Sequence, residues 1–251
     1  MHEILALTLQ GLQQELTRVQ GIAMNLSNAQ TVGFKREMNM VRPFSEFVQA
    51  GTSQVAGMPA TAAAKTMPAI DLQPATLRST GQSLDIALAG EGWFEIQTAN
   101  GLSYTRQGNF QLDARGRLVT VQGDPVMGTG GEIVLPSTVL SIDATGTIFE
   151  AQAATGTEPL RPLAQLRIVQ PDDAAHLQRL GAGLFAIDGG VTQMPDAAVQ
   201  LRQGSLENSN VSAMREMTDL MQAMRHFESL QKVAHAVDDM LGTAIRKLGD
   251  V

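Results

Sequence analysis

The first stretch of the chain has the pattern of a long amphipathic helix. From about Glu3 to Asn28, apolar residues recur at alternating spacings of four and three, which average close to the coiled-coil period of about 3.5 residues. The apolar positions are Leu5, Leu9, Leu12, Leu16, Val19, Ala23 and Leu26. A single helix of this kind is only marginally stable in water, so the pattern predicts that it packs against a partner.

A second stripe of the same kind occupies the last fifth of the chain, from residue 204 to the end. No Pro or Gly interrupts this segment until Gly242, and Ser209, Asn210 and Ser212 are candidate N-caps because their short polar side chains can bond the free N–H groups of a first turn. The apolar positions are Met217, Leu220, Met224, Phe227, Leu230, Val233, Val237, Met240, Ala244 and Leu248.

The two stripes are matched in period and lie at opposite ends of the chain, which favours a terminal helical pair. We expect the first helix to pack against the second through one set of residues from each. The set from the first helix is Leu5, Leu9, Leu12, Leu16 and Val19, and the set from the second is Met217, Leu220, Met224, Phe227 and Val237.

The chain between the two stripes changes character twice. Residues 31–74 are rich in Gly, Ala, Thr, Gln and Pro without sustained periodicity, which predicts an extended linker with room for short strands. Gly33 is placed to end the first helix in a left-handed conformation. From about Ala75, short segments of alternating apolar and polar residues, with turns about every 8–12 residues, predict a β-rich domain of sandwich or barrel type. Asn100-Gly101 predicts a type I′ hairpin turn.

These elements predict an α+β fold with three parts. Residues 1–30 and 205–251 form a terminal helical domain, in which the N- and C-terminal helices make a coiled-coil-like pair. Residues 31–74 form the linker, and residues 75–204 form the β-rich domain.

Charge and composition narrow the class of protein. The net charge is −7, which argues against nucleic acid as a partner because phosphate binding needs clustered Lys and Arg. No apolar stretch of about 20 residues predicts an integral membrane segment. The N-terminus lacks the basic region and apolar run of a cleavable secretory signal. The chain contains no Cys, which excludes disulfides and thiolate metal sites.

No residue pattern predicts a catalytic, metal or cofactor site. The glycine clusters at 90–92 and 128–131 lack the strand–glycine–helix context of a dinucleotide site, so we assign them to hairpin turns. The four His show no metal-ligand spacing, and His226 and His235 lie about 180° apart on a helix. A two-carboxylate hydrolase site assembled from distant Asp and Glu residues stays open as an alternative.

Three blocks of the sequence carry a resemblance to a known family. Residues Asn25–Arg36 resemble the N-terminal signature of bacterial flagellar rod and hook axial proteins. The segments Leu84–Phe94 and Tyr104–Val119 look like the β-domain block that this family shares. Residues Gly204–Val211 match its C-terminal signature. The blocks span nearly the whole chain in the expected order.

Within the family, the resemblance is nearest to the proximal-rod F type. Distal-rod and hook relatives usually have a Gln-Arg-x-Tyr-Glu run in the last helix, where this chain has Met-Arg-His-Phe-Glu from Met224 to Glu228. Phe227, the paired Asp238-Asp239 and Trp93 favour the F type. A distal-rod or hook-type subunit is the alternative within the family.

The resemblance implies a structural subunit of the flagellar basal-body rod and not an enzyme. Such subunits pass through the flagellar type III export apparatus without cleavage and polymerise helically, with their terminal helices inside and their β domain outside. The implied partners are further copies, other rod subunits and the export apparatus, and some helix contacts are expected between subunits. The rival from another class is a peptidoglycan-cleaving hydrolase.

The implied assembly interface draws on both terminal regions of the chain. It comprises Leu5, Leu9, Leu12, Leu16, Val19, Leu26, Asn28, Gly33, Phe34, Asn210, Val211, Met217, Leu220, Met224, Arg225, Phe227, Val237 and Asp238.

Overall fold

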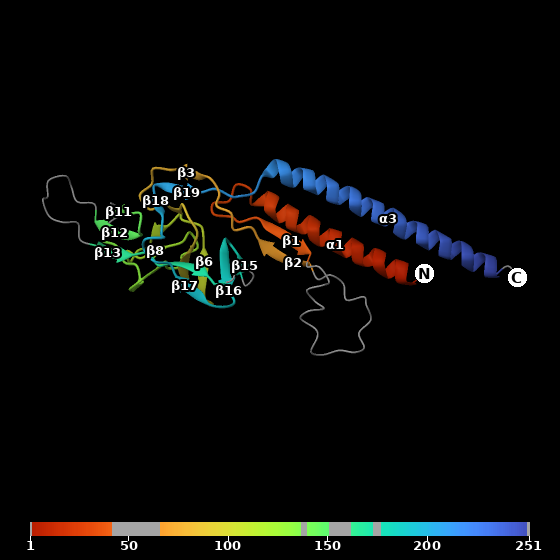
Figure 1. Cartoon of the computed structure of the whole chain (residues 1–251), viewed down its shortest axis with the longest axis horizontal. Coiled ribbons are helices and arrows are strands. Elements are labelled where there is room, and N and C mark those ends of the chain that lie inside the picture. The colour runs from red at the N-terminus through yellow and green to blue at the C-terminus, as the bar shows by residue number, and fades with distance from the viewer. Residues whose placement is uncertain (1, 42–65, 137–139, 151–161, 173–176, 250–251) are drawn as a thin grey trace. The chain divides into compact units, whose positions relative to one another are not determined.

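The computed structural model describes residues 2–41, 66–136, 140–150, 162–172 and 177–249. They divide into two compact units. The helical unit consists of Met1–Ser27, Glu37–Asp71 and Val211–Val251, and the β-rich unit of Asn28–Arg36 and Leu72–Asn210. The predicted α+β class is confirmed, with one long helix near each end of the chain and a strand-rich region between them (Figure 1).

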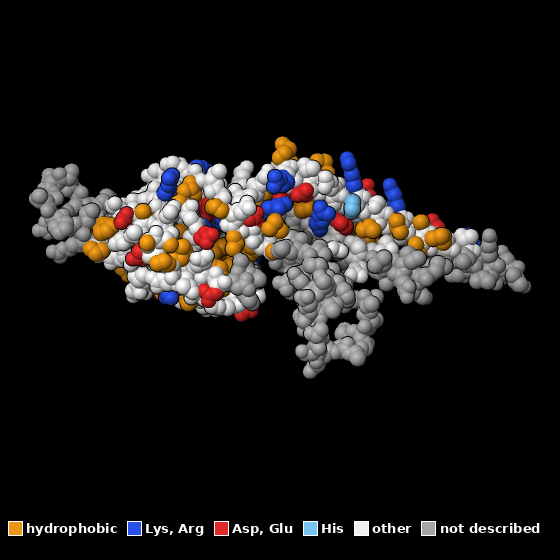
Figure 2. All heavy atoms as spheres, in the orientation of Figure 1, with side chains coloured by type: hydrophobic (Ala, Val, Ile, Leu, Met, Phe, Trp, Pro, Cys, Tyr) orange, Lys and Arg blue, Asp and Glu red, His pale blue; other side chains and the backbone are white. Residues whose placement is uncertain are grey.

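The helical unit is built on two antiparallel helices, α1 (His2–Ser27) and α3 (Ala213–Gly249). They run side by side, so the start of α1 and the end of α3 lie at the same end of the unit (Figure 1). Strands β1 (Glu37–Val41) and β2 (Thr66–Ile70) form an antiparallel pair in this unit. Both strands fall in the predicted linker, of which residues 42–65 lie outside the described residues. Figure 2 shows hydrophobic side chains along the exposed surface of α3.

The start of α3 follows from its capping residue, Ser212. The bounds of α1 agree with the helix predicted from Glu3 to Asn28. Among the candidate N-caps of the second helix, Ser212 immediately precedes α3, and its carbonyl accepts a 3.0 Å hydrogen bond from the N–H of Glu216. The Glu216 carboxylate lies in the first turn of α3, where the partial positive charge of a helix N-terminus favours an acid.

The β-rich unit contains a six-stranded antiparallel sheet with the order β15-β16-β6-β5-β14-β17. The bounds in that order are Leu177–Gly181, Leu184–Ile187, Gly101–Thr105, Trp93–Thr98, Ile168–Pro171 and Val191–Gln193. A three-stranded sheet is made by β11 (Leu140–Ile142), β12 (Thr147–Glu150) and β13 (Pro162–Gln165).

The remaining strands form two-stranded pairs: β3 (Leu77–Ser79) with β19 (Ser205–Glu207), β4 (Ile86–Leu88) with β18 (Leu201–Gln203), β7 (Gln111–Leu112) with β8 (Leu118–Val119), and β9 (Met127–Gly128) with β10 (Gly131–Glu132). Within the described residues, no sheet closes on itself. The finer prediction of a sandwich or barrel is therefore not confirmed.

The main hydrophobic core lies on one face of β5. Phe94 and Ile96 belong to the core cluster, together with residues of β4, β8, β12 and β18. Because side chains alternate along a strand, Trp93 and Glu95 point to the opposite face. The Trp93 ring packs against Phe185 of β16 there, with ring centroids 4.7 Å apart. Both faces of β5 are thus buried, which explains why its first four residues are all inaccessible.

The hairpin predicted at Asn100-Gly101 is present between β5 and β6, but its turn differs. Thr98 pairs with Gly101, so Ala99 and Asn100 are the loop residues. Gly101 has φ +115, and the only positive-φ non-glycine residue in the described part of the chain is Ala182. A type I′ turn needs positive φ at both loop residues, so that prediction was wrong. Gly101 takes the unusual conformation one position later.

Candidate functional site

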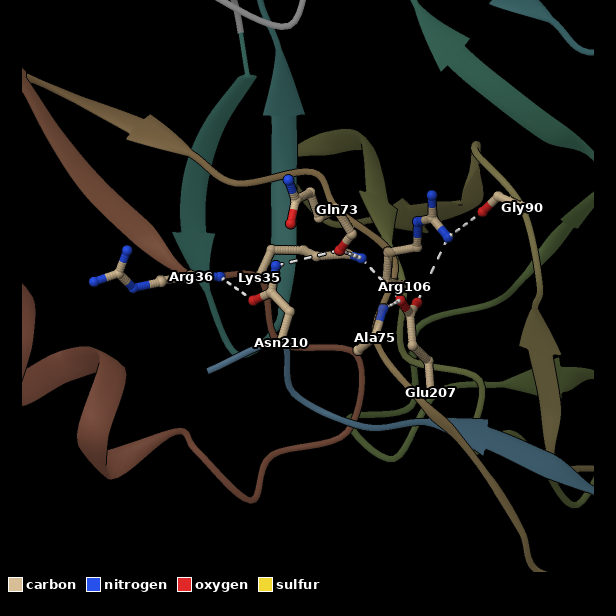
Figure 3. Close-up of polar contacts among 8 residues, drawn as sticks. All are labelled: Lys35, Arg36, Gln73, Ala75, Gly90, Arg106, Glu207 and Asn210. Carbon is tan, nitrogen blue, oxygen red and sulfur yellow. Dashed lines mark hydrogen bonds and ion pairs between the residues drawn. The ribbon is translucent and has the colours of Figure 1, made fainter. Parts of the chain in front are cut away.

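A cluster of buried charges lies in the β-rich unit (Figure 3). Lys35 Nζ lies 2.8 Å from Glu207 Oε1 and donates a 2.9 Å hydrogen bond to the Gln73 carbonyl. The N–H of Ala75 donates to the same Glu207 oxygen at 2.9 Å. Arg106 Nη1 forms an ion pair of 3.5 Å with Glu207 Oε2. The side chains of Lys35, Arg106 and Glu207, which we call the charge cluster, are all buried.

The electrostatics of the charge cluster depend on Glu207, because one anion serves two cations. Arg106 Nη1 also donates a 2.8 Å hydrogen bond to the Gly90 carbonyl, and its guanidinium lies over the Trp93 ring. Burial lowers the pKa of Arg106, whereas the carboxylates of Glu207 and Glu91 oppose that shift. An arginine keeps its charge in a protein, and a buried charge without a partner is strongly unfavourable. Glu207 is therefore the counter-ion that both buried cations share.

Gly33 holds the backbone beside the charge cluster. Its N–H donates a 2.8 Å hydrogen bond to the Glu207 carbonyl. It has φ +64, which confirms the predicted left-handed conformation. A Cβ at this position would lie 2.6 Å from the carbonyl carbon of Arg106, closer than real contacts allow. Both the backbone angle and the lack of space therefore require glycine here.

Asn210 joins residues 33–36, 73–75 and 207–210 through hydrogen bonds with the backbone. Its Oδ1 accepts a 2.6 Å hydrogen bond from the N–H of Arg36, and its Nδ2 donates to the Gln73 carbonyl at 3.3 Å. Its own N–H donates to the Phe34 carbonyl at 3.3 Å. The Phe34 ring is buried, and Cζ of the Arg179 guanidinium lies 4.3 Å from the centroid of the ring. Residues 33–36, 73–75 and 207–210 are thus bound to one another in the β-rich unit.

Each of the three resembling sequence blocks supplies one member of the charge cluster. Lys35 comes from the N-terminal block, Arg106 from the β-domain block and Glu207 from the C-terminal block. Sequence reasoning included these residues in the blocks but assigned none of them to a site, since 172 positions separate Lys35 from Glu207. The available signal was a charged residue within each block. The arrangement is suited to locking distant segments together, because its ion pairs join residues from all three blocks.

A cavity of about 490 Å³ beside Arg106 contains the two carboxylates most relevant to the hydrolase alternative. Glu91 accepts a 2.9 Å hydrogen bond from Gln170 Nε2, and Asp172 accepts a 2.7 Å hydrogen bond from the Thr192 hydroxyl. Each carboxylate is thus held by a hydrogen bond from a neighbouring polar side chain.

In the helical unit, the buried contact between α1 and α3 uses a regular stripe on α3. Glu216, Ala223 and Val237 are buried, and Leu220, Phe227 and Leu230 between them are half-buried. On α1 the buried residues are Thr8, Ile22 and Asn25. A Cβ on Gly11 of α1 would lie 3.4 Å from Leu230 Cδ1, which shows how closely the two helices approach there.

The structure corrects part of the predicted helix packing. Leu9 and Leu16 are 53% and 47% exposed, and Met217 and Met224 are 48% and 47% exposed. These four residues therefore do not form the buried contact within the chain. The reason is that spacings of three and four fit two neighbouring stripes on α3, and the periodicity analysis combined members of both.

Asn25 connects α1 with both of its neighbours in the helical unit. Its Nδ2 donates hydrogen bonds to the Glu37 carbonyl at 2.8 Å and to Glu216 Oε2 at 3.3 Å. Its Oδ1 accepts a 2.9 Å hydrogen bond from the N–H of Glu37. Because a buried amide is favourable only when paired, these bonds fix the start of β1 and the start of α3 against the end of α1.

The other predicted interface residues are spread over both units and are not gathered into one site. Leu12, Val19, Leu26, Asn28 and Val211 are half-buried, and Arg225 is exposed. Asn28 Oδ1 accepts a 3.1 Å hydrogen bond from the Thr31 hydroxyl. The side chains of Leu5 and Asp238 lie outside those that the structure describes. The role of all these residues in assembly stays a prediction.

The described residues also bear on membrane spans and metal sites. Neither α1 nor α3, as far as the structure describes them, is long and apolar enough to cross a membrane. The described His, Asp and Glu side chains form no group of three or more that is placed to hold a metal ion.

Two family models match this architecture. The model of the C-terminal region of flagellar basal body rod FlgEFG proteins matches residues 202–247, which include β19 and most of α3. The model of the D1 domain of flagellar hook proteins FlgE/F/G matches residues 87–150, which include β5, β6 and Arg106. The two matches thus fall on the β-rich unit and on the C-terminal helix.

Full-length relatives extend these matches. The flagellar basal-body rod protein FlgF of Escherichia coli (strain K12) is 33% identical over 240 residues, covering 92% of each chain. FlgF of Salmonella typhimurium is 34% identical over 239 residues with the same coverage, and FlgG of Agrobacterium fabrum is 31% identical over 265 residues, covering 97% of this chain and 98% of its own. The chain belongs to the flagellar basal-body rod protein family. Of these three relatives, the two FlgF proteins have the higher identity, in agreement with the predicted F-type resemblance.

Proposed function

We propose that this chain is a structural, non-catalytic subunit of the proximal rod of the bacterial flagellar basal body, polymerising helically through its terminal helices to form part of the drive shaft. Family membership supports this role, because the relatives described above are named as rod proteins. Contacts that join head to tail without closing into a ring are what such a filament requires.

One observation supports a particular surface of α3 as the interface with other subunits. Met214, Met217, Met221 and Met224 follow one another on α3 at spacings of three and four, and all are exposed. At about 100° per residue, this methionine stripe lies roughly a third of a turn from the stripe that faces α1. An apolar stripe left open beside a satisfied helix contact is typical of a surface that another protein covers.

The terminal helices then act in two ways. Within each subunit, α1 and α3 form a coiled-coil-like pair through the stripe containing Ala223 and Val237. Between subunits, the methionine stripe, together with Leu9 and Leu16 of α1, contacts neighbouring rod subunits. Methionine suits this role, since its flexible side chain fits non-identical neighbours.

The remaining parts of the proposal follow from the family resemblance. The helical pair lies in the inner tube of a rod that spans the periplasm, and the β-rich unit faces outward. The subunit reaches this place through the flagellar type III export apparatus without a cleaved signal peptide. The charge cluster keeps the segments that lead to the two helices bound to the β-rich unit.

Replacing Met217 and Met221 together by Asp tests the interface. We expect the purified chain to keep its helix content, because about half of each side chain is exposed. We expect complemented cells to lose motility and their basal bodies to lack rods in electron micrographs. The matched control is Gln222→Asp, on a different face of α3. Normal rods with the double variant would refute the methionine stripe as an interface.

A further inference from the structure

The four methionines in the first part of α3, Met214, Met217, Met221 and Met224, lie on one face of the helix. The stripe toward α1 contains Glu216, Leu220, Ala223, Phe227, Leu230 and Val237, and has no methionine. The four apolar positions from 214 to 224 on the outer stripe are all methionine. Leucine has a similar size and a similar helix propensity, so apolarity and helix formation alone do not require this choice. Sulfur chemistry distinguishes the two stripes.

We propose that the methionine stripe is an oxidation site, at which peroxide blocks incorporation of subunits that have not yet assembled. In this step the peroxide O–O bond breaks, one oxygen is transferred to the thioether sulfur to give a sulfoxide, and the rest of the peroxide leaves as water. Sulfur is oxidised by two electrons and peroxide is reduced by two. The inference rests on the proposed function, since it concerns regulation of the same surface.

The methionine stripe is accessible to an oxidant, as are the single methionines Met24 and Met240, which are 42% and 57% exposed. The chain contains no Cys, so no thiol competes for the oxidant. Met214 is 76% exposed and Met221 57%, whereas Met194 in the core of the β-rich unit is only 9% exposed. Because oxidation requires access to the sulfur, the stripe reacts before Met194.

The position of the methionine stripe determines which contact its oxidation weakens. A sulfoxide is polar, and burying it without a hydrogen-bond partner disfavours the contact with a neighbouring subunit. The contact between α1 and α3 is unaffected, because it uses the other stripe. An oxidised subunit therefore folds but does not assemble. A subunit already in the rod is protected, because its neighbour covers the sulfurs.

The test compares two pools of the chain in the same cells. Cells are exposed to dilute hydrogen peroxide while the chain is being induced, and the sulfoxide fraction of peptides from residues 214–224 is measured by mass spectrometry in purified basal bodies and in the unassembled fraction. We expect about tenfold more sulfoxide in the unassembled pool, the ratio that corresponds to burying one unpartnered polar group. Equal fractions in the two pools would overturn the proposal. The Met194 peptide is the internal control and is expected to be equal in both.

A second variant separates this inference from the proposed function. Replacing all four methionines by leucine keeps the stripe apolar but removes the oxidisable sulfur. We expect rods to form and their number to resist peroxide doses that reduce wild-type rod formation. If the four-leucine variant were as sensitive as the wild type, the oxidation proposal would fail while the interface survived. If Met217→Asp/Met221→Asp assembled normally, the interface itself would fail.

Discussion

At the scale of single residues, the buried ion pairs of Glu207 join segments that are distant in the sequence. Gly33 was predictable from sequence, because glycine after a helix commonly adopts a left-handed conformation. Its crowding against Arg106 was not predictable, because that contact depends on the fold. The contact between Lys35 and Glu207 was not predictable either, because it forms in the folded structure, in which β19 pairs with β3.

Glu207→Gln tests the charge cluster. The substitution preserves size but leaves the buried cations Lys35 and Arg106 without an anion, and we expect it to lower the free energy of unfolding by about 3–5 kcal/mol. Urea denaturation followed by Trp93 fluorescence measures the effect. The control is Glu150→Gln at an exposed position, expected to change stability by less than about 0.5 kcal/mol. A similar midpoint for both variants would contradict a stabilising role for Glu207.

Glu95 predicts a pH dependence. Burial raises the pKa of its carboxyl above the ordinary value of 4.5, and Arg167, whose Nη1 lies 3.3 Å from Glu95 Oε1, partly opposes the shift. Because the folded chain binds this proton more tightly than the unfolded chain does, stability falls as pH rises from about 4.5 through the raised pKa. Glu95→Gln removes that loss.

The measurement for Glu95 is the difference in urea midpoint between wild type and Glu95→Gln at several pH values. Other titrating groups cancel in this difference. We expect the variant to gain stability relative to the wild type as the pH rises above the ordinary carboxyl value of 4.5 and through the raised pKa of Glu95. A difference that is constant with pH would show that Glu95 has the same proton affinity in both states.

At the scale of elements, α3 carries two surfaces on one helix. Its existence and its start near Ser212 were predictable from the absence of Pro and Gly and from the capping residues. The apolar residues that face α1 were not predictable, because spacings of three and four describe both stripes equally well. Only the position of α1 distinguishes Ala223, which is buried, from Met224, which is exposed.

Ala223→Glu tests the stripe that faces α1. Ala223 is fully buried in the helical unit, so a charged side chain there must either separate the helices or remain without a partner. We expect a weaker helical circular dichroism signal at about 222 nm and a clearly lower free energy of unfolding for the helical unit. Gln222→Glu is the adjacent exposed control, with similar helix propensity. Equal helix content in the two variants would show that the position does not hold the pair together.

At the scale of the whole molecule, the two units have separate cores. The main core cluster belongs to the β-rich unit, whereas the buried apolar residues described in α1 and α3 are few. The single tryptophan, Trp93, is buried in the β-rich unit, while helical circular dichroism reports mainly on the helical unit. Two spectroscopic signals therefore report on different units.

We expect the two signals to change at different urea concentrations, with helical dichroism lost first and Trp93 fluorescence changing later. A chain that unfolds in one step gives coincident curves for all probes. Ala223→Glu should move only the dichroism curve, and Glu207→Gln should move the fluorescence curve. Coincident wild-type curves would show that the two units unfold together.

The sequence by itself determined the local features of this protein. Helices at both ends, turns in the middle and the left-handed Gly33 follow from periodicity, capping and backbone sterics, which act over a few residues. The motifs in Asn25–Arg36 and Gly204–Val211 also carried the family resemblance. Only the tertiary structure decided which charges meet in the Lys35–Glu207–Arg106 cluster and which stripe of α3 remains exposed. These depend on contacts between segments far apart in the chain, and the matched periods of the two stripes predicted that the helices pair without specifying which side chains meet.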